Sequence, residues 1–314
     1  MPDEFPQRPS HEQVLHYFEL YCDKHQISEL VDFDSEVKKT EREGDKWKVI
    51  VKEGEEKPLR EYTCKYLSVC NGHHRRQIMP KESQVKGLKN FRGEIIHSGS
   101  YRVAEKFREK RVLIAGLGIS GSDIFDDLKS VAKAVFISSR RIPLSIEKEC
   151  LKPTFEVSKD GSLSFSDGTT LEIDAIIFCW GYSYHFPFFE DIKDEELKRQ
   201  LKVEENPSRV SLYKHVFVPG VDNLAFIGLP SVDGSLHPIC DKQAEWFSCV
   251  ASGECALPPR EEMEKEIEIW KENKRPYRPM QIASQSYLKA IDELIEKHRK
   301  KKLNCLNKNL DLYK

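Results

Sequence analysis

Three glycines at the spacing Gly-x-Gly-x-x-Gly, namely Gly116, Gly118 and Gly121, suggest a site for a dinucleotide. In such sites the first glycine permits a tight turn, the second lets the backbone approach a pyrophosphate, and the third lets a helix pack closely on a strand. Free amides at the helix N-terminus then bind the anion. The motif alone is weak evidence, because glycine turns are common. Here it follows the apolar run 112–115 and opens a stretch that is predicted to be helical to about Lys129, which strengthens the prediction.

The residues after the next apolar run indicate which dinucleotide this site would bind. A second strand is predicted at 134–137, and Ser138-Ser139-Arg140-Arg141 follow it. Sites for NAD place Asp or Glu about 20 residues after the glycines, where the carboxylate holds the ribose hydroxyls. Guanidinium groups favour the 2′-phosphate of NADP instead, because they offer planar, charged hydrogen bonds. We therefore expect NADP, bound by Arg140 and Arg141, while the alternative interpretation is an ordinary solvated strand end.

Other reactive side chains give weaker predictions. The nine cysteines include no Cys-x-x-Cys pair, which argues against structural disulfides and against a disulfide reductase. Cys70, His73 and His74 could suggest a metal site, but adjacent histidines seldom converge on one ion and no second ligand pair follows. No metal is therefore predicted. Tyr101 and Lys106 miss the Tyr-x-x-x-Lys spacing of a short-chain dehydrogenase.

Composition and charge limit the class of protein. The chain has 314 residues, of which 39% are hydrophobic and 32% charged, so it can bury a core, and wholesale disorder is excluded. A formal net charge of -2 gives no overall basic field for nucleic acid. The basic cluster at 297–302 could contact RNA or an anionic membrane, but a solvated helix end is the preferred interpretation. No apolar run approaches the roughly 18 residues needed to cross a bilayer, so we expect a soluble intracellular protein.

The elements that must position the glycines are predicted from periodicity and turn residues. Ser10 and Gln13 form a capping box before an amphipathic helix that carries Val14, Phe18 and Tyr21 on its apolar side. Two Asp-Gly turns predict an antiparallel meander between Phe155 and Ile173. Further strands are predicted at 47–51, 62–70, 174–182 and 224–227, and further helices at 238–252, 261–272 and 281–302.

Phe91, Gly93, His97 and Tyr101 form the pattern F-x-G-x-x-x-H-x-x-x-Y, which resembles the fingerprint of the flavin-containing monooxygenase family. The pattern precedes the glycines by the interval that this family uses. Further segments resemble family motifs in the same order, and together they cover roughly residues 5–260: 10–14, Val69 to His74, Gly118 to Asp123, Phe178 to Tyr182, and Leu224 to Gly228.

The resemblance implies an α/β fold with two dinucleotide-binding domains, in which a Rossmann-like NADP domain is inserted into a flavin domain. We accordingly expect residues 1–85 to be a remnant of the FAD-binding domain and 86–204 to be the inserted NADP-binding domain. Residues 205–258 would return to the FAD-binding domain, and 259–314 would form a charged helical C-terminal tail.

The same resemblance implies roles for individual residues. Ser120, Gly121, Ser122 and Asp123 would line the pyrophosphate and ribose of NADP, with Arg140 on the 2′-phosphate. His97 and Tyr101 would fasten the NADP domain to the flavin domain, although His97 could equally be a structural histidine.

A flavin-containing monooxygenase uses NADPH and FAD as cofactors. In that family NADPH reduces FAD, O2 adds to the reduced flavin as a hydroperoxide, and a soft nitrogen or sulfur nucleophile takes one oxygen atom. The resemblance therefore implies a small nucleophilic substrate and O2 as partners, with no nucleic acid. It implies a cytoplasmic location or one at the periphery of the endoplasmic reticulum membrane.

The sequence also departs from the family pattern. The family opens with a βαβ unit of about 30 residues that carries a Gly-x-Gly-x-x-Gly for FAD, whereas nine residues precede the first helix cap here. We therefore expect a form truncated at the N-terminus, with an incomplete flavin domain. No residue corresponds to the family's catalytic Asn, so the catalytic residues stay unknown. Cys179 and Trp180 replace the family's Ala and Thr, and Asn71 replaces a Thr.

These departures leave other functions open. The alternative is a catalytically impaired NADP-binding relative that acts as a binding or partner protein. A direct dehydrogenase is a third hypothesis, but it lacks an identifiable pair of residues for proton transfer.

Overall fold

The computed structural model describes residue 6 and residues 9–54, 56–139, 151–152, 154–204, 209–232, 235–272 and 281–310. The chain forms two compact units, one made of Met1–Leu67 and Phe186–Lys198, the other of Ser68–His185 and Arg199–Lys314. Helices and parallel strands alternate in the second unit, so the fold is α/β.

The helices are α1 (His11–His25), α2 (Ile119–Leu128), α3 (Glu195–Gln200), α4 (His237–Ala251), α5 (Arg260–Glu272) and α6 (Ser284–Leu310). The strands are β1 (Ser35–Glu43), β2 (Lys46–Glu53), β3 (Leu59–Cys64), β4 (Leu67–Val69), β5 (Arg76–Gln77), β6 (Glu94–His97), β7 (Arg111–Ala115), β8 (Ala134–Ser138), β9 (Leu151–Lys152), β10 (Phe155–Val157), β11 (Leu163–Phe165), β12 (Thr170–Leu171), β13 (Ala175–Phe178), β14 (Tyr182–Ser183), β15 (Phe217–Val218), β16 (Val221–Phe226), β17 (Ser231–Val232) and β18 (Gln281–Ile282). None of the helices in the described ranges combines the length and apolarity needed to cross a membrane.

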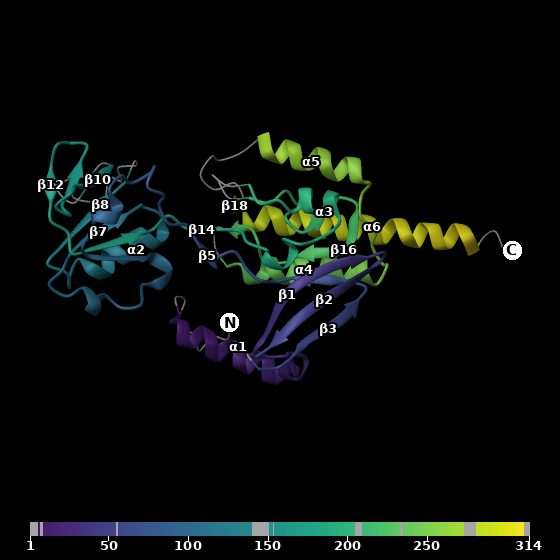
Figure 1. Ribbon diagram of the computed structural model, residues 1–314. Helices are drawn as coiled ribbons and strands as arrows, with labels where there is room; N and C mark the ends of the chain where they lie inside the picture. Colours follow the sequence, from purple (N-terminus) through teal and green to yellow (C-terminus); the bar gives the residue numbers. More distant parts are fainter. Residues whose placement is uncertain are drawn as a thin grey trace. The chain divides into compact units, whose positions relative to one another are not determined.

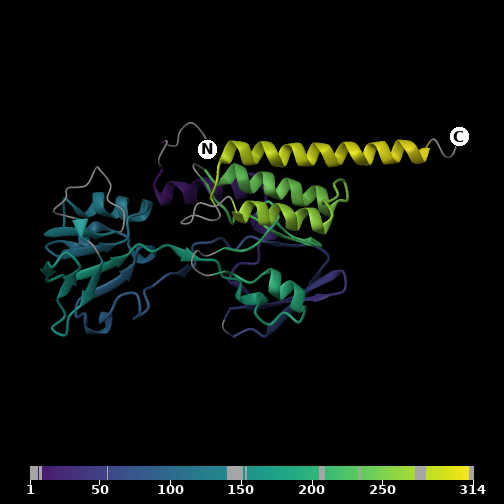
Figure 2. The same cartoon turned by 90° about the horizontal axis from the view of Figure 1, so that it is seen from above.

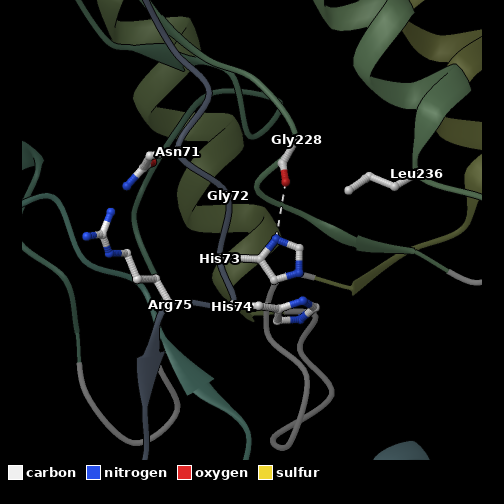
Figure 3. A pocket seen from close by; sticks show the side chains of 7 residues that line it. All are labelled: Asn71, Gly72, His73, His74, Arg75, Gly228 and Leu236. Atoms are coloured by element: carbon white, nitrogen blue, oxygen red, sulfur yellow. Dashed lines mark hydrogen bonds between the residues drawn. The ribbon is translucent and has the colours of Figure 1, made fainter. Parts of the chain in front are cut away.

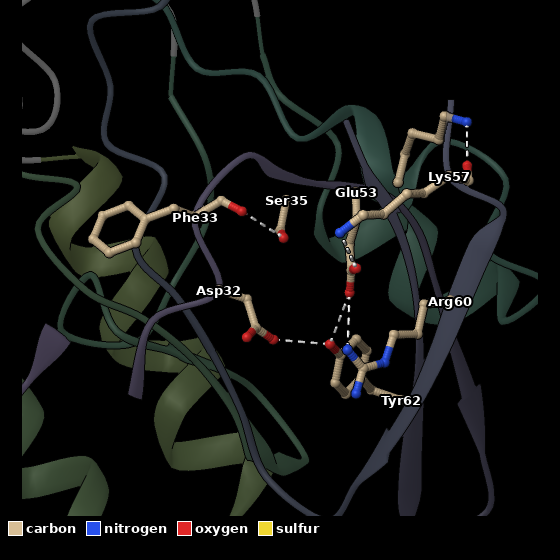
Figure 4. Close-up of polar contacts among 8 residues, drawn as sticks. Asp32, Phe33, Ser35, Glu53, Lys57, Arg60 and Tyr62 are labelled. Atoms are coloured by element: carbon tan, nitrogen blue, oxygen red, sulfur yellow. Dashed lines mark hydrogen bonds and ion pairs between the residues drawn. The ribbon is translucent and has the colours of Figure 1, made fainter. Parts of the chain in front are cut away.

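The first unit contains α1 and an antiparallel meander of β1, β2 and β3 (Figure 1). The capping box of α1 is confirmed, because the Ser10 side chain accepts from the Gln13 N–H and the Gln13 side chain accepts from the Ser10 N–H. Trp47 of β2 is fully buried against Phe189. On the meander, Tyr62 donates to Asp32 over 2.8 Å, and Arg60 lies 2.9 Å from Glu53 (Figure 4).

Two sequence predictions for this region need correction. The strand expected over 62–70 is divided, since β3 ends at Cys64 and β4 starts at Leu67. Strand β1 has no counterpart among the predicted strands, because eight of its nine residues are charged or polar and no apolar alternation is visible. It nevertheless pairs with β2 along its length.

The second unit is built around a parallel sheet of five strands in the order β6-β13-β7-β8-β9. The predicted strand, glycine turn, helix and strand are confirmed as β7, α2 and β8. Alternate residues of a strand point to opposite faces. Val112 and Ile114 therefore pack with Ile124 and Leu128 of α2 on one face, while Leu113 packs on the other face with the meander of β10, β11 and β12.

An ion pair fixes β13 beside β7. The Arg111 guanidinium binds both carboxylate oxygens of Asp174, at 2.9 and 3.1 Å, and the Arg111 N–H donates to the same carboxylate over 2.7 Å. These bonds lower the pKa of Asp174 below its ordinary value. The strand predicted over 174–182 is confirmed only for Ala175–Phe178, because the chain leaves the sheet there and Tyr182 starts β14, which pairs with β5. The carboxyl end of β13 lies beside the glycine turn.

The rest of the second unit packs helices on a sheet of three strands in the order β15-β16-β4. The helices α4, α5 and α6 lie side by side in Figure 2 and share one apolar core with Phe217 and Ala225. Met263 and Ile267 of α5, with Ile291 of α6, are buried there. The segment predicted as a C-terminal tail therefore contributes to the core.

Candidate functional site

The glycine turn between β7 and α2 has the stereochemistry of a dinucleotide loop. Gly116 has φ +108°, and a Cβ there would lie 2.8 Å from the carbonyl oxygen of Cys179. A Cβ on Gly121 would lie 2.2 Å from the carbonyl oxygen of Gly116. These two positions exclude a side chain because protein fills the space. At Gly118, by contrast, a Cβ would meet nothing within 4 Å.

The first turn of α2 begins beside Gly118, the glycine of the motif where an added side chain would meet no neighbouring atom. Gly118 is the N-cap and provides no side-chain cap for the helix amides. Ser120, Ser122 and Asp123 are exposed on this turn, and the Gly116 N–H donates to the carbonyl oxygen of Ser138 over 2.9 Å, which ties the loop to the end of β8. Helix amides without a side-chain cap are suited to binding an anion.

These features fit the pyrophosphate of NADP, because backbone can approach the ligand at the one glycine position that the protein leaves open. Ser120, Ser122 and Asp123 lie at the start of α2, and their predicted contacts with the pyrophosphate and ribose stay a prediction. Arg140 and Arg141 lie outside the described residues, so the choice of NADP over NAD stays a prediction.

Cys179 and Trp180 lie beside the glycine loop. Trp180 Cδ1 is 3.2 Å from the position that a Gly116 Cβ would take, and its ring meets Phe178 edge-on with centroids 5.4 Å apart. Burial raises the pKa of the Cys179 thiol to about 12, so this side chain is a neutral thiol at physiological pH. The Trp180 ring thus borders the glycine loop.

His97 is buried at the end of β6, and both of its ring nitrogens are bonded to backbone. The Gly99 N–H donates to Nδ1 over 3.0 Å, so Nε2 carries the hydrogen and donates to the carbonyl oxygen of Gly181 over 2.9 Å. Burial lowers the pKa of His97, which keeps the ring neutral. This geometry favours the structural role for His97 over direct contact with a cofactor.

Tyr101 lies against α2, the helix that packs on the parallel sheet. Its hydroxyl donates to Asp127 of α2 over 2.9 Å, and its ring stacks on Phe107 with centroids 5.8 Å apart. Burial, with the bond to Asp127, raises the pKa of the hydroxyl above its ordinary range. Tyr101 therefore fastens the segment after β6 to α2, while His97 fastens it to the loop between β13 and β14. That the two residues join an NADP domain to a flavin domain stays a prediction.

A second candidate site is a pocket of about 330 Å³ where β4 and β16 end. It is lined by Asn71, Gly72, His73, His74, Arg75, Gly228 and Leu236 (Figure 3). In open α/β sheets, ligands bind at the carboxyl ends of the strands. The residues that follow β4 and β16 thus meet at a place where such sheets hold ligands.

Two histidines give the pocket its polar character. His73 Nδ1 lies 3.2 Å from the carbonyl oxygen of Gly228, so Nδ1 donates and Nε2 keeps a lone pair. The His74 ring meets that of His73 edge-on, with centroids 4.1 Å apart. Burial lowers the pKa of both histidines, and both are therefore neutral at physiological pH.

A chain of buried hydrogen bonds supports Gly228. Gln243, fully buried on α4, accepts from the Gly228 N–H over 2.8 Å and donates to the Tyr287 hydroxyl over 2.8 Å. The Tyr287 hydroxyl donates to the carbonyl oxygen of Lys214 over 2.6 Å. No sequence pattern predicted this series of hydrogen bonds. The only signal for it was a Gln on an otherwise apolar helix face.

The described residues fit FAD only in part. The pocket offers room for part of a ligand, but 111–128 is the only strand, glycine turn and helix of this type in the described ranges, and NADP would take it. The pyrophosphate of a second dinucleotide has no cradle there. No cluster of three His, Cys, Asp or Glu suited to a metal is present in the described part of the chain.

Comparisons with known proteins point to one family. The sequence profile described as "Flavin-binding monooxygenase-like" matches residues 1–150 and 144–306. The chain is 35% identical over 271 residues to flavin-containing monooxygenase FMO GS-OX-like 2 of Arabidopsis thaliana, with 81% of this chain and 55% of the relative covered. It therefore spans about half the length of the curated relatives that it matches.

Two solved structures share the fold. The S-allyl-L-cysteine S-oxygenase from Allium sativum superposes with a TM-score of 0.80 at 28% identity, covering 94% of this chain and 69% of that one. Tmm from Pelagibacter sp. strain HTCC7211 superposes with a TM-score of 0.77 at 26% identity, covering 95% of this chain and 69% of that one.

Proposed function

Because the chain belongs to the flavin-binding monooxygenase-like family, we propose that it acts in an NADPH- and FAD-dependent monooxygenase that oxygenates soft sulfur or nitrogen nucleophiles. The observation that carries this proposal is the β7–α2 loop, which closes around Gly116 and Gly121 and stays open at Gly118. Similarity to an S-oxygenase favours a sulfur nucleophile as the first substrate class to test.

In this proposal the loop residues bind the nucleotide. The amides that begin α2 would hold the NADP pyrophosphate, and Ser120, Ser122 and Asp123 would contact phosphate or ribose oxygens. Arg140 and Arg141 would bind the 2′-phosphate and give preference for NADPH over NADH. Bound NADPH supplies a hydride, and FAD supplies the ring that activates oxygen.

The Trp180 ring would exclude water along one side of the nucleotide, because it borders Gly116 at the end of the central strand. The His73 ring, neutral and partly buried, would accept a proton at Nε2. Because no second pyrophosphate cradle is present in the described ranges, no step is assigned to residues around FAD.

We also propose an NADP-binding domain at 86–204 and flavin-domain segments at 1–85 and 205–258. Residues 259–314 would form the C-terminal segment. Strand β5 of the first flavin-domain segment pairs with β14 of the proposed NADP-binding domain.

A direct assay tests the proposal. The full chain is incubated in air with FAD, NADPH and S-allyl-L-cysteine, and sulfoxide is measured by mass spectrometry alongside NADPH oxidation, with FAD alone as the blank. A tertiary amine replaces the sulfide in a second series, and NADH replaces NADPH in a third. We expect sulfoxide formation that prefers NADPH. Binding of NADPH, measured by its fluorescence, without any oxygenated product in either series would refute the activity and favour a nucleotide-binding partner protein.

A further inference from the structure

A pair of buried cysteines lies away from both candidate sites, where α4 ends. Cys249 is 4% exposed on the last turn of α4, and Cys255 is 5% exposed in the loop that follows. The Cys255 N–H donates to the carbonyl oxygen of Cys249 over 3.0 Å. This backbone bond, together with the hydrogen bond between the two cysteine side chains, places the residues side by side, as a disulfide requires.

The two sulfurs have different surroundings. Arg299 of α6 places Nη2 3.0 Å from Cys249 Sγ, and a guanidinium at this distance stabilises a thiolate. The Cys255 thiol is directed to the carbonyl oxygen of Ile295, 3.9 Å away. Burial, followed by the hydrogen bond with the Cys249 side chain, raises the pKa of Cys255 to about 11. Cys249 is thus the sulfur that contacts the guanidinium, and Cys255 is the thiol beside it.

We propose that Cys249 and Cys255 are a peroxide-reactive pair, in which Arg299 activates Cys249 and Cys255 resolves the product as a disulfide. The Cys249 thiolate attacks one oxygen of hydrogen peroxide, the S–O bond forms as the O–O bond breaks, and the departing hydroxide takes up a proton as water. The Cys255 thiol then attacks that sulfur, the S–S bond forms, and the hydroxyl leaves with the thiol proton as water. The two sulfurs lose two electrons together, and the peroxide is reduced to two waters.

The position of the pair gives the reaction a structural effect. The disulfide would close a short ring over 249–255 and remove the thiol hydrogen that Cys255 directs to α6. Glu254 lies 3.5 Å from Arg299 and competes with Cys249 for the guanidinium, so it moderates the activation.

Peptide mapping tests the proposal on the full chain. The protein is reduced, freed of reductant, treated with graded hydrogen peroxide, alkylated and digested with trypsin. Both cysteines fall in the peptide 243–260, and the exposed Cys70 falls alone in 66–75, which serves as the internal control. We expect peptide 243–260 to lose two hydrogens at doses that leave Cys70 fully alkylated. Oxidation of Cys70 at equal or lower doses would overturn the proposal.

Variants separate the three roles. Cys255→Ser should stop at a sulfenic acid on Cys249 that a cyclic 1,3-diketone traps, and Cys249→Ser should leave Cys255 reduced. Arg299→Gln should slow oxidation about tenfold, because the charged hydrogen bond to the attacking sulfur is lost, while Arg299→Lys keeps most of the rate. Glu254→Gln, a change at an exposed site, should speed it. Equal rates in Arg299→Gln and Glu254→Gln would show that the guanidinium does not activate the thiol.

Discussion

Gly118→Ala separates ligand binding from folding more cleanly than other changes in the glycine loop. The residue has φ -102° and ψ -165°, which alanine adopts without strain, and its Cβ would meet no atom within 4 Å. We expect the free energy of unfolding to change by less than about 1 kcal/mol, since a glycine N-cap is only modestly better than alanine. The added methyl group would instead occupy the space in which the pyrophosphate approaches the backbone.

The expected loss of affinity follows from this overlap. Forcing an extra methyl group into a well-packed contact costs about 1–3 kcal/mol, which corresponds to a dissociation constant for NADPH that rises about 5- to 150-fold. The assay is titration with NADPH followed by its fluorescence, with thermal unfolding measured in parallel. Ser130→Ala, at an exposed position after α2, is the control. An unchanged NADPH dissociation constant in Gly118→Ala would refute the placement of the pyrophosphate at this loop.

Three further changes test the structure by measurements of stability. Gly121→Ala would place Cβ 2.2 Å from the carbonyl oxygen of the loop's first residue, so denaturant unfolding should show a loss of about 1–3 kcal/mol. Tyr287→Phe leaves the Gln243 amide and the carbonyl oxygen of Lys214 without their shared hydroxyl, and a loss of about 1–3 kcal/mol is expected in the same assay; no loss would mean that water replaces the hydroxyl. Burial, with the nearby Lys214 charge, lowers the pKa of His215 from 6.5 to about 4, so the unfolded chain binds this proton first. Stability should therefore fall as pH decreases from about 6.5 toward 4, by up to about 3 kcal/mol, and denaturation of His215→Phe should show a shallower pH dependence than the wild-type chain.

Local signals predicted the parts of the fold that depend on local structure. The capping residues at Ser10, the Asp-Gly turns and the strand, glycine turn and helix at 111–128 are confirmed, because each is encoded within a few residues. Strand β1 was missed since its pairing with β2, not its own composition, makes it a strand. The packing of α5 and α6 into the core was missed for a similar reason, as charged residues outnumber the apolar ones on the surface of both helices.

The candidate sites were likewise predictable only where a local motif encodes them. The roles of Gly116 and Gly121 follow from a motif with a defined stereochemistry, and the close contacts at both glycines agree with it. The pocket at His73 depends on Gly228, which is 155 residues away along the chain, and on Gln243, whose partners cannot be identified from local sequence. Cofactor contacts of Ser120, Asp123 and the two arginines stay predictions.

The glycine loop and the pocket are connected by a short series of contacts within the second unit. The carbonyl oxygen of Gly181, in the loop between β13 and β14, accepts from both His97 Nε2 and the Ile78 N–H, at 2.9 and 3.0 Å. The next residue, Tyr182, places its ring 4.9 Å from His97 on one side and 4.9 Å from His74 of the pocket on the other. These contacts, with the pairing of β5 and β14, thus hold the two segments that contain these strands together. His97 donates one of the two bonds to Gly181 and accepts from the Gly99 N–H. A buried neutral ring with one donor and one acceptor is therefore what this position requires.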